Sequence, residues 1–332
     1  MAAALDITSN PEIDFSQYSP QQLLTTLYGH QGFKPQQQDI ITRVLNREGP
    51  TLGIMPTGGG KSLCFQIPAL LQENLTVVVS PLIALMKDQI DALTKKEIKV
   101  ARFVNSSLSE QDKEEILDLV VQKKIKLLYL SPEGLKSERI LEVLKQIKID
   151  LLVIDEAHCI STWGHNFRPD YLRLPTVMKE FGNPQILALT ATATIEVEKD
   201  IQQQLGITCQ VFKASFDRPN LYLEVVPLAE NVKKELFLLN LLQKLTGPTI
   251  IFVTYQRTAE KLAQLISATG VSCLYYHAGL ESEEREKRQN AFISGECDII
   301  IATIAFGMGI DKPDIRTIIH YNLPQSIENY YQ

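Results

Sequence analysis

The sequence predicts an α/β protein of two lobes, each a doubly wound, mostly parallel sheet with helices on both faces. Three observations predict this fold class. Apolar runs of strand length recur along the chain, and segments of helical spacing separate them. Such alternation is typical of parallel sheets that are buried on both faces. The length of 332 residues is sufficient for two domains, each with its own core.

The first lobe is predicted from the first series of apolar runs. These runs are residues 51–55, 75–80, 126–131, 150–155 and 185–190. Between them lie stretches with helical periodicity, such as "KSLCFQIPALLQ" (61–72) and "SEQDKEEILDLVVQK" (109–123). A strand therefore alternates with a helix throughout this part of the chain.

A second series of apolar runs predicts the second lobe. It comprises residues 249–254, 271–277, 298–303 and 315–324, again separated by helical stretches. We expect a polar leader over residues 1–21, a first lobe over 22–208 and a second lobe over 209–332, with the junction near 208–220. The pattern contains no short repeat and no long flexible linker.

Composition limits the classes of function. The net charge of −6 argues against binding of nucleic acid by bulk positive charge, so any polyanion must be held by placed groups. The five cysteines are widely spaced and odd in number, which indicates neither a disulfide framework nor a zinc site. No signal sequence or apolar run of about 20 residues is present, so we expect a cytoplasmic protein without a membrane span.

The segment "MPTGGGKS" (55–62) follows an apolar strand and opens a helix, as a phosphate-binding loop does. The backbone of Thr57, Gly58, Gly59 and Gly60 is expected to face phosphate oxygens. Lys61 then reaches the β and γ phosphates, and Ser62 ligates Mg²⁺. Met55 stands where the first glycine of this pattern usually lies. A triple-glycine turn alone is more often only a turn, but the attached Lys-Ser and the flanking elements favour the phosphate loop.

An acidic pair follows the buried run "DLLVI". The end of that strand places Asp155 and Glu156 at the carboxyl edge of the sheet, where open α/β folds bind ligands. We expect Asp155 to hold the Mg²⁺ shell and Glu156 to orient and deprotonate the attacking water. Such a pair alone is usually a solvated strand end; beside a phosphate loop it is interpreted as catalytic.

Two threonines alternate at the end of another apolar run, in "LALTATAT" (187–194). Because side chains alternate along a strand, Thr190 and Thr192 face the same side. We expect them to hydrogen-bond His158 and to relay the state of the nucleotide site. The alternative is that threonine simply suits the end of a strand.

Seven motifs, in order along the chain, resemble those of the RecQ family of superfamily 2 DNA helicases. They are "FKPQQ", "MPTGGGKS", "VVVSPLIALMKDQ", "DEAHCISTWGHNFRPDY", "LTATA", "YHAGL" and "IATIAFGMGIDKP". The resemblance runs from about residue 22 to the end, and its most specific part is Asp155 to Tyr171. It implies two RecA-like lobes with ATP bound in the cleft between them.

The resemblance assigns the segment after the acidic pair to an aromatic-rich loop that contacts single-stranded DNA and couples it to ATP hydrolysis. Trp163, Phe167 and Arg168 carry this coupling by resemblance, and His165 supports it. Stacking of bases on aromatic side chains tolerates any sequence, which suits a motor on arbitrary DNA. The alternative is an aromatic cluster that fills a gap in the core, with Phe167 and Tyr171 packed inward.

The stretch "LYGHQGFKPQQQDII" (27–41) resembles the adenine-recognition motif of the family. Gln37 matches the glutamine whose amide reads the adenine edge. His30 and Lys34 stand where the family usually has tyrosine and arginine. An ammonium does not stack on a base as a guanidinium does, so we expect weaker adenine binding.

Five further contacts follow from the resemblance alone. Ser80, Pro81 and Ser131 in the first lobe, and Thr303 in the second, match residues near DNA phosphates. Asp311 matches a residue near the nucleotide ribose. Each of them is equally compatible with an ordinary strand end or turn.

The resulting expectation is a RecQ-like motor core that uses ATP and Mg²⁺ to unwind DNA with 3′-to-5′ polarity, a polarity that comes from the resemblance alone. The alternatives are an RNA helicase or translocase that does not unwind efficiently, and a binding module that clamps DNA in response to ATP. In the family, the glutamine matching Gln332 opens a motif whose arginine reaches the γ-phosphate. We therefore expect residues 1–332 alone to turn over slowly.

Overall fold

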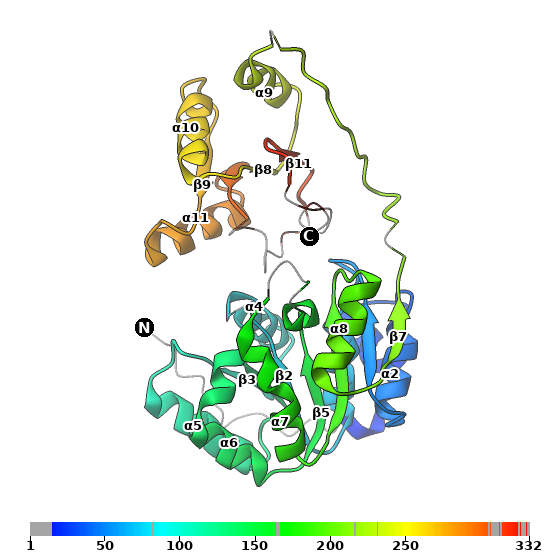
Figure 1. The fold of residues 1–332 in the computed structure, drawn as a ribbon. Coiled ribbons are helices and arrows are strands. Elements are labelled where there is room, and N and C mark those ends of the chain that lie inside the picture. The colour runs from blue at the N-terminus through cyan, green and yellow to red at the C-terminus, as the bar shows by residue number, and fades with distance from the viewer. Residues whose placement is uncertain are drawn as a thin grey trace. The chain divides into compact units, whose positions relative to one another are not determined.

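The computed structural model describes residues 15–81, 83–161, 163, 167–215, 217–230, 232–304, 306, 312, 314–324, 326 and 330. The chain forms two compact units, Met1–Arg218 and Pro219–Gln332 (Figure 1). Each unit has its own sheet and its own hydrophobic cores, as two independent α/β lobes require.

The first unit is built on a seven-stranded sheet in which every pairing is parallel. Its order is β3-β4-β2-β5-β6-β1-β7. The strands are β1 (Thr51–Ile54), β2 (Leu75–Val79), β3 (Ala101–Val104), β4 (Leu127–Leu130), β5 (Ile149–Ile154), β6 (Gln185–Thr190) and β7 (Gln210–Lys213). Because all strands run the same way, the residues that follow β1, β5 and β6 meet at one edge.

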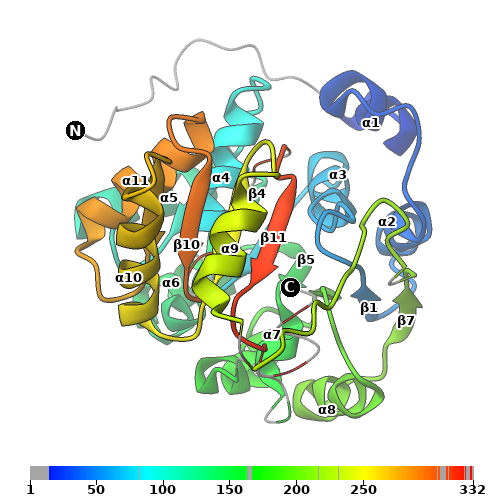
Figure 2. The same cartoon turned by 90° about the horizontal axis from the view of Figure 1, so that it is seen from above.

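Both faces of this sheet are buried. Leu152 and Ile154 of β5 pack into one core, whereas Leu151 and Val153 pack into the other. The first core is covered by α5 (Glu110–Val121), α6 (Glu138–Lys145), α7 (Leu174–Glu180) and α8 (Ile195–Leu205). The second is covered by α1 (Pro20–Tyr28), α2 (Gln37–Leu45), α3 (Leu63–Leu71) and α4 (Ile83–Thr94). Figure 2 shows α3 between α1 and α2, and α2 beside β1.

The second unit repeats this architecture on a smaller scale. Its four strands pair in parallel in the order β11-β8-β10-β9. They are β8 (Thr249–Phe252), β9 (Cys273–Tyr276), β10 (Ile299–Ala302) and β11 (Thr317–His320). One core joins the sheet to α9 (Lys234–Leu242) and α10 (Gln256–Ser267), and the other joins it to α11 (Ser282–Ser294). The predicted fold class is therefore confirmed for both units.

The structure differs from the expected organisation in two ways. Strand β3 was not predicted; it is a short strand at the edge of the sheet with only its end residues buried. Strand β7 lies beyond the expected boundary at residue 208, yet it pairs with β1 in the first sheet. The first compact unit consequently extends to Arg218, which lies within the expected junction region of residues 208–220.

Among the residues that the structure describes, every helix is too short or too polar to cross a lipid bilayer.

Candidate functional site

The predicted phosphate loop, residues 55–62, joins β1 to α3 at the carboxyl edge of the first sheet. Met55 extends the β1–β6 pairing by one bond, from its N–H to the Thr190 carbonyl at 3.0 Å. Gly58 and Gly60 have φ values of 74° and 76°, a left-handed backbone that favours glycine. The hydroxyl of Ser62 makes no capping hydrogen bond to α3, so it is not committed to the helix.

The loop folds back on itself. The N–H of Gly59 donates to the carbonyl of Pro56 at 2.8 Å, which closes a tight turn. The Lys61 ammonium lies 3.5 Å from the carbonyl oxygen of Met55. The two groups that would bind a phosphate therefore have partners within the loop.

Lys34 and Gln37 contact this loop directly. The Lys34 ammonium donates to the carbonyl of Gly58 at 2.7 Å. The Gln37 amide nitrogen donates to the carbonyls of Gly59 and Gly60, at 3.2 and 3.0 Å. Gln37 is 1% exposed, whereas His30 lies after the end of α1 with its side chain exposed. The sequence alone gave no sign of the Lys34 contact, because its partner is a main-chain carbonyl.

Asp155 and Glu156 follow β5 at the same edge of the sheet. The Asp155 carboxylate is 5% exposed and accepts hydrogen bonds from the Ser80 hydroxyl at 3.1 Å and from the Glu156 N–H at 3.0 Å. Burial and the neighbouring Glu156 charge raise the pKa of Asp155 to about 6, against the attraction of the Lys61 ammonium. The Lys61 ammonium of the phosphate loop and the Asp155 carboxylate therefore lie close enough to interact electrostatically.

His158 connects the acidic pair to β6. Its Nδ1 lies 2.9 Å from the Thr190 hydroxyl and 3.3 Å from a Glu156 carboxylate oxygen. The Thr190 hydroxyl donates its hydrogen to the Thr192 carbonyl at 3.0 Å, so its oxygen accepts from a hydrogen on Nδ1. The contact of His158 with Thr190 was expected; Thr192 enters this network through its main chain.

The aromatic side chains after the acidic pair divide into two groups. Trp163 is 79% exposed and Phe167 is 37% exposed. Tyr171 is fully buried, and its hydroxyl donates to the main-chain carbonyl of Asp155 at 3.0 Å. The alternative of an aromatic core cluster therefore holds for Tyr171 and not for Trp163. Arg168 is half-buried and lies 3.9 Å from the Glu133 carboxylate.

Further contacts fix the start of this segment. The Ser161 hydroxyl donates to the Asp200 carboxylate of α8 at 2.6 Å. The N–H of Trp163 donates to the same hydroxyl at 3.2 Å. Sequence reasoning missed this pair, because Ser161 and Asp200 are far apart in the chain and Asp200 lies outside the motifs.

The four described residues that were expected near DNA phosphates are buried at strand ends. Ser80 is 1% exposed and its hydroxyl is bonded to Asp155. The Ser131 hydroxyl accepts from the Gly134 N–H and caps the short helix η2 (Pro132–Lys136). Pro81 and Thr303 are also buried. These side chains therefore support the strand ends and do not present polar groups at the surface. His165 and Asp311, the two remaining predicted site residues, lie outside the described residues.

His277 of the second unit belongs to the "YHAGL" motif, and the sequence predicts no role for it. It is 3% exposed and its Nε2 lies 3.1 Å from the Glu260 carboxylate of α10.

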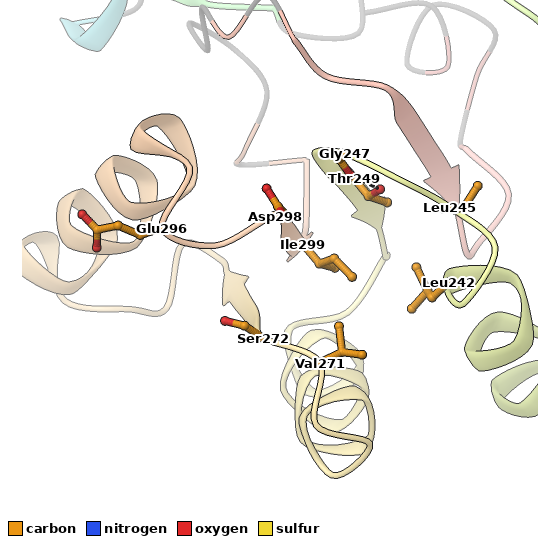
Figure 3. Close-up of a pocket in the computed structure, with 9 residues that line it drawn as sticks. All are labelled: Leu242, Leu245, Gly247, Thr249, Val271, Ser272, Glu296, Asp298 and Ile299. Atoms are coloured by element: carbon orange, nitrogen blue, oxygen red, sulfur yellow. Dashed lines mark hydrogen bonds between the residues drawn. The ribbon is translucent and has the colours of Figure 1, made fainter.

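A cavity of about 270 Å³ lies at the amino-terminal edge of the second sheet, the edge opposite His277 (Figure 3). It is lined by Gly247, Thr249, Ser272, Asp298 and five apolar or acidic residues. None of these nine lining residues is a predicted site residue.

Two family models match the chain. The model described as DEAD/DEAH box helicase matches residues 34–201, and the model described as helicase conserved C-terminal domain matches residues 232–332. The two matches fall within the two compact units.

Curated relatives are similar over most of the chain. The probable ATP-dependent DNA helicase RecS of Bacillus subtilis is 44% identical over 314 residues, which cover 94% of this chain and 63% of the relative. The ATP-dependent DNA helicase RecQ of Haemophilus influenzae is 40% identical over 312 residues, which cover 93% of this chain and 50% of the relative. The chain thus spans about half to two thirds of these relatives. Their similarity confirms the expected resemblance to RecQ-type helicases.

A solved structure agrees at the level of the fold. The DUF1998 helicase MrfA bound to DNA has a TM-score of 0.75 with 16% identity, over 97% of this chain and 46% of that chain. Identity this low shows the fold alone, and it supports two RecA-like lobes.

Proposed function

This chain belongs to the DEAD/DEAH box helicase family, and we propose that it is the motor core of a RecQ-type DNA helicase driven by ATP. The observation that carries the proposal is the position of Lys61 and Asp155 at one edge of a parallel sheet, with electrostatic interaction between them. Relatives named as ATP-dependent DNA helicases support the choice of DNA. The finer parts, 3′-to-5′ polarity and single-stranded or forked substrates, rest on the family resemblance.

The residues at this edge suit Mg²⁺ and a nucleoside triphosphate. Asp155 is a buried carboxylate with a raised pKa beside a second acid, and a hard cation would relieve that repulsion. Together with Ser62 it would hold Mg²⁺, which neutralises developing charge on the phosphates. Lys61 binds the β and γ phosphates, and Gln37 reads the adenine.

Glu156 is the group proposed to accept a proton from the attacking water. Its backbone is left-handed, with φ of 48°, at the turn out of β5. His158 lies 3.3 Å from its carboxylate and hydrogen-bonds Thr190. His158 therefore orients Glu156, the proposed base, and links it to the end of β6. Thr190 and Thr192 at that strand end are proposed to relay the state of the nucleotide site.

Trp163 and Phe167 are proposed to stack on the bases of single-stranded DNA. Their exposure leaves aromatic faces accessible, as stacking requires. The same segment reaches Asp155 through the Tyr171 hydroxyl, so DNA contact and the metal-binding carboxylate share one connected piece of chain. Arg168 and His165 are assigned to this contact by the resemblance only.

Steady-state ATP hydrolysis with no nucleic acid, with single-stranded DNA and with single-stranded RNA tests the proposal. We expect stimulation by DNA and not by RNA. Stimulation by RNA alone would favour an RNA helicase or translocase. Affinity for DNA that depends on ATP, without ATP hydrolysis, would favour a binding module. A cytoplasmic location stays a prediction.

A further inference from the structure

Ser161, the first residue of the aromatic segment (residues 161–171), is held by a side chain from a different element. Its hydroxyl donates to the Asp200 carboxylate of α8 at 2.6 Å, a short bond of the kind that hydroxyls make to carboxylates. The same hydroxyl accepts the Trp163 N–H at 3.2 Å. Ser161 is fully buried, whereas the Trp163 side chain is exposed. One hydroxyl thus joins a helix to the main chain of an exposed aromatic residue.

The Asp200 carboxylate is itself restrained. Its other oxygen accepts from the Gln204 amide at 3.1 Å, one turn further along α8. Val197 and Ile201, on the same helix, are buried in one core of the first unit. Asp200 therefore presents its carboxylate to Ser161 from a firmly packed helix.

α8 follows directly from the strand end that contacts the acidic pair. Thr190 ends β6 and its hydroxyl lies 2.9 Å from His158 Nδ1, and the side chain of Thr194 caps the first turn of α8. Asp200 lies in the second turn of that helix. The Asp200 carboxylate therefore connects the start of the aromatic segment with the stretch of chain that His158 contacts.

We propose that Asp200 is a positioning residue for single-stranded DNA: through the Ser161 hydroxyl it holds the main chain at Trp163, so that the indole is placed to stack on a base. This inference rests on the proposed function, since it requires Trp163 to contact DNA. A side chain that is restrained before binding loses less conformational freedom when DNA binds, and this raises affinity. A carboxylate does not attract a polyanion, so the contribution of Asp200 comes from position alone.

The fluorescence of the chain reports directly on this contact, because Trp163 is its single tryptophan. Time-resolved anisotropy measures how freely the indole moves in the DNA-free protein, and quenching during titration with a single-stranded oligonucleotide measures binding. We expect Asp200→Ala to increase the amplitude of fast indole motion. It should also weaken DNA binding about tenfold, the effect of one lost hydrogen bond to a charged group. Loss of a negative charge alone would instead tighten binding, so the sign separates position from charge.

Three further variants complete the test. Asp200→Asn loses the charge but keeps an oxygen acceptor for Ser161, so its DNA affinity should stay within about threefold of the wild type. Ser161→Ala should behave like Asp200→Ala, and the double variant should lose no more than either single variant, because the two residues act as one contact. Asp118→Ala removes an exposed carboxylate from α5 and should match the wild type in both properties.

Unchanged indole motion in Asp200→Ala overturns the proposal, and so does DNA affinity that is unchanged or tighter in that variant. Thermal unfolding of each variant adds a separate readout: lower stability with wild-type DNA affinity would make the pair purely structural. Absence of quenching by DNA in the wild type would remove the DNA contact of Trp163, and the proposal with it, even where indole motion still increases in Asp200→Ala.

Discussion

The Tyr171 hydroxyl donates a 3.0 Å hydrogen bond to the main-chain carbonyl of Asp155, and Tyr171 is fully buried. The bond joins the far end of the aromatic segment to the strand end that carries the acidic pair. Tyr171 has no predicted chemical role of its own, yet it connects the segment that contains Trp163 with the residue proposed to hold Mg²⁺.

Tyr171→Phe should weaken this connection while keeping the ring in the core. Loss of the hydroxyl leaves the buried Asp155 carbonyl without this donor, which costs about 1–3 kcal/mol of unfolding free energy. We expect DNA to stimulate ATP hydrolysis less in this variant. Urea unfolding and DNA-stimulated hydrolysis measure the two effects; a destabilised variant with full stimulation would make the bond purely structural.

Trp163→Ala should reduce affinity for single-stranded DNA without lowering stability, because the side chain is 79% exposed. Base stacking contributes about 1–3 kcal/mol per base, so a loss of that size is expected. Fluorescence anisotropy with a labelled oligonucleotide measures it. Tyr222→Ala is the matched control, since Tyr222 is an 85% exposed aromatic outside the segment. Equal affinities in the two variants would exclude Trp163 from the DNA contact.

Glu156→Gln should bind Mg²⁺-ATP and fail to hydrolyse it. The amide keeps the size of the side chain but cannot accept the proton. Equilibrium binding of a fluorescent ATP analogue and release of phosphate measure the two properties on one sample. If the variant lost nucleotide affinity instead, Glu156 would be a ligand or structural residue.

Asp150→Asn should destabilise the first unit by about 2–4 kcal/mol at neutral pH. Asp150 is 4% exposed and accepts from the Arg47 guanidinium and from both nitrogens of Asn74, at 2.9 to 3.0 Å. Burial raises the pKa of this carboxyl, but the bonds from Asn74 and Arg47 outweigh it, and the net shift is downward.

The sign of that shift sets a pH dependence. A carboxyl with a depressed pKa in the folded state adds stability above its unfolded pKa of about 3.9, and loses it as pH falls through the folded value. The difference in unfolding free energy between wild type and Asp150→Asn should therefore be smaller near pH 3 than at pH 7. A difference independent of pH would show that the charge of Asp150 contributes nothing.

Much of the fold was predictable because its central strands are apolar on both faces. β2 and β5 are buried along their whole length, so hydrophobic runs mark them directly. β7 was not predicted, because an edge strand with exposed end residues has no such run.

The candidate site was predictable where chemistry requires a residue type at a fixed position. Lys61, Asp155 and the His158–Thr190 pair belong to this group. Burial of Ser80 and Ser131 was not predictable, because a hydroxyl at a strand end serves equally as a cap or a surface donor. The Lys34 contact depends on how the loop backbone lies, which residue identity does not determine.

The central claim is that ATP turnover at the Lys61–Asp155 site depends on DNA. It is tested most directly by the rate of ATP hydrolysis as single-stranded DNA is titrated, with Lys61→Ala as the background. We predict that the wild-type rate rises with DNA to a plateau while Lys61→Ala stays at the background rate throughout. A wild-type rate that does not change with DNA, or a Lys61→Ala rate that follows the wild type, would contradict the account.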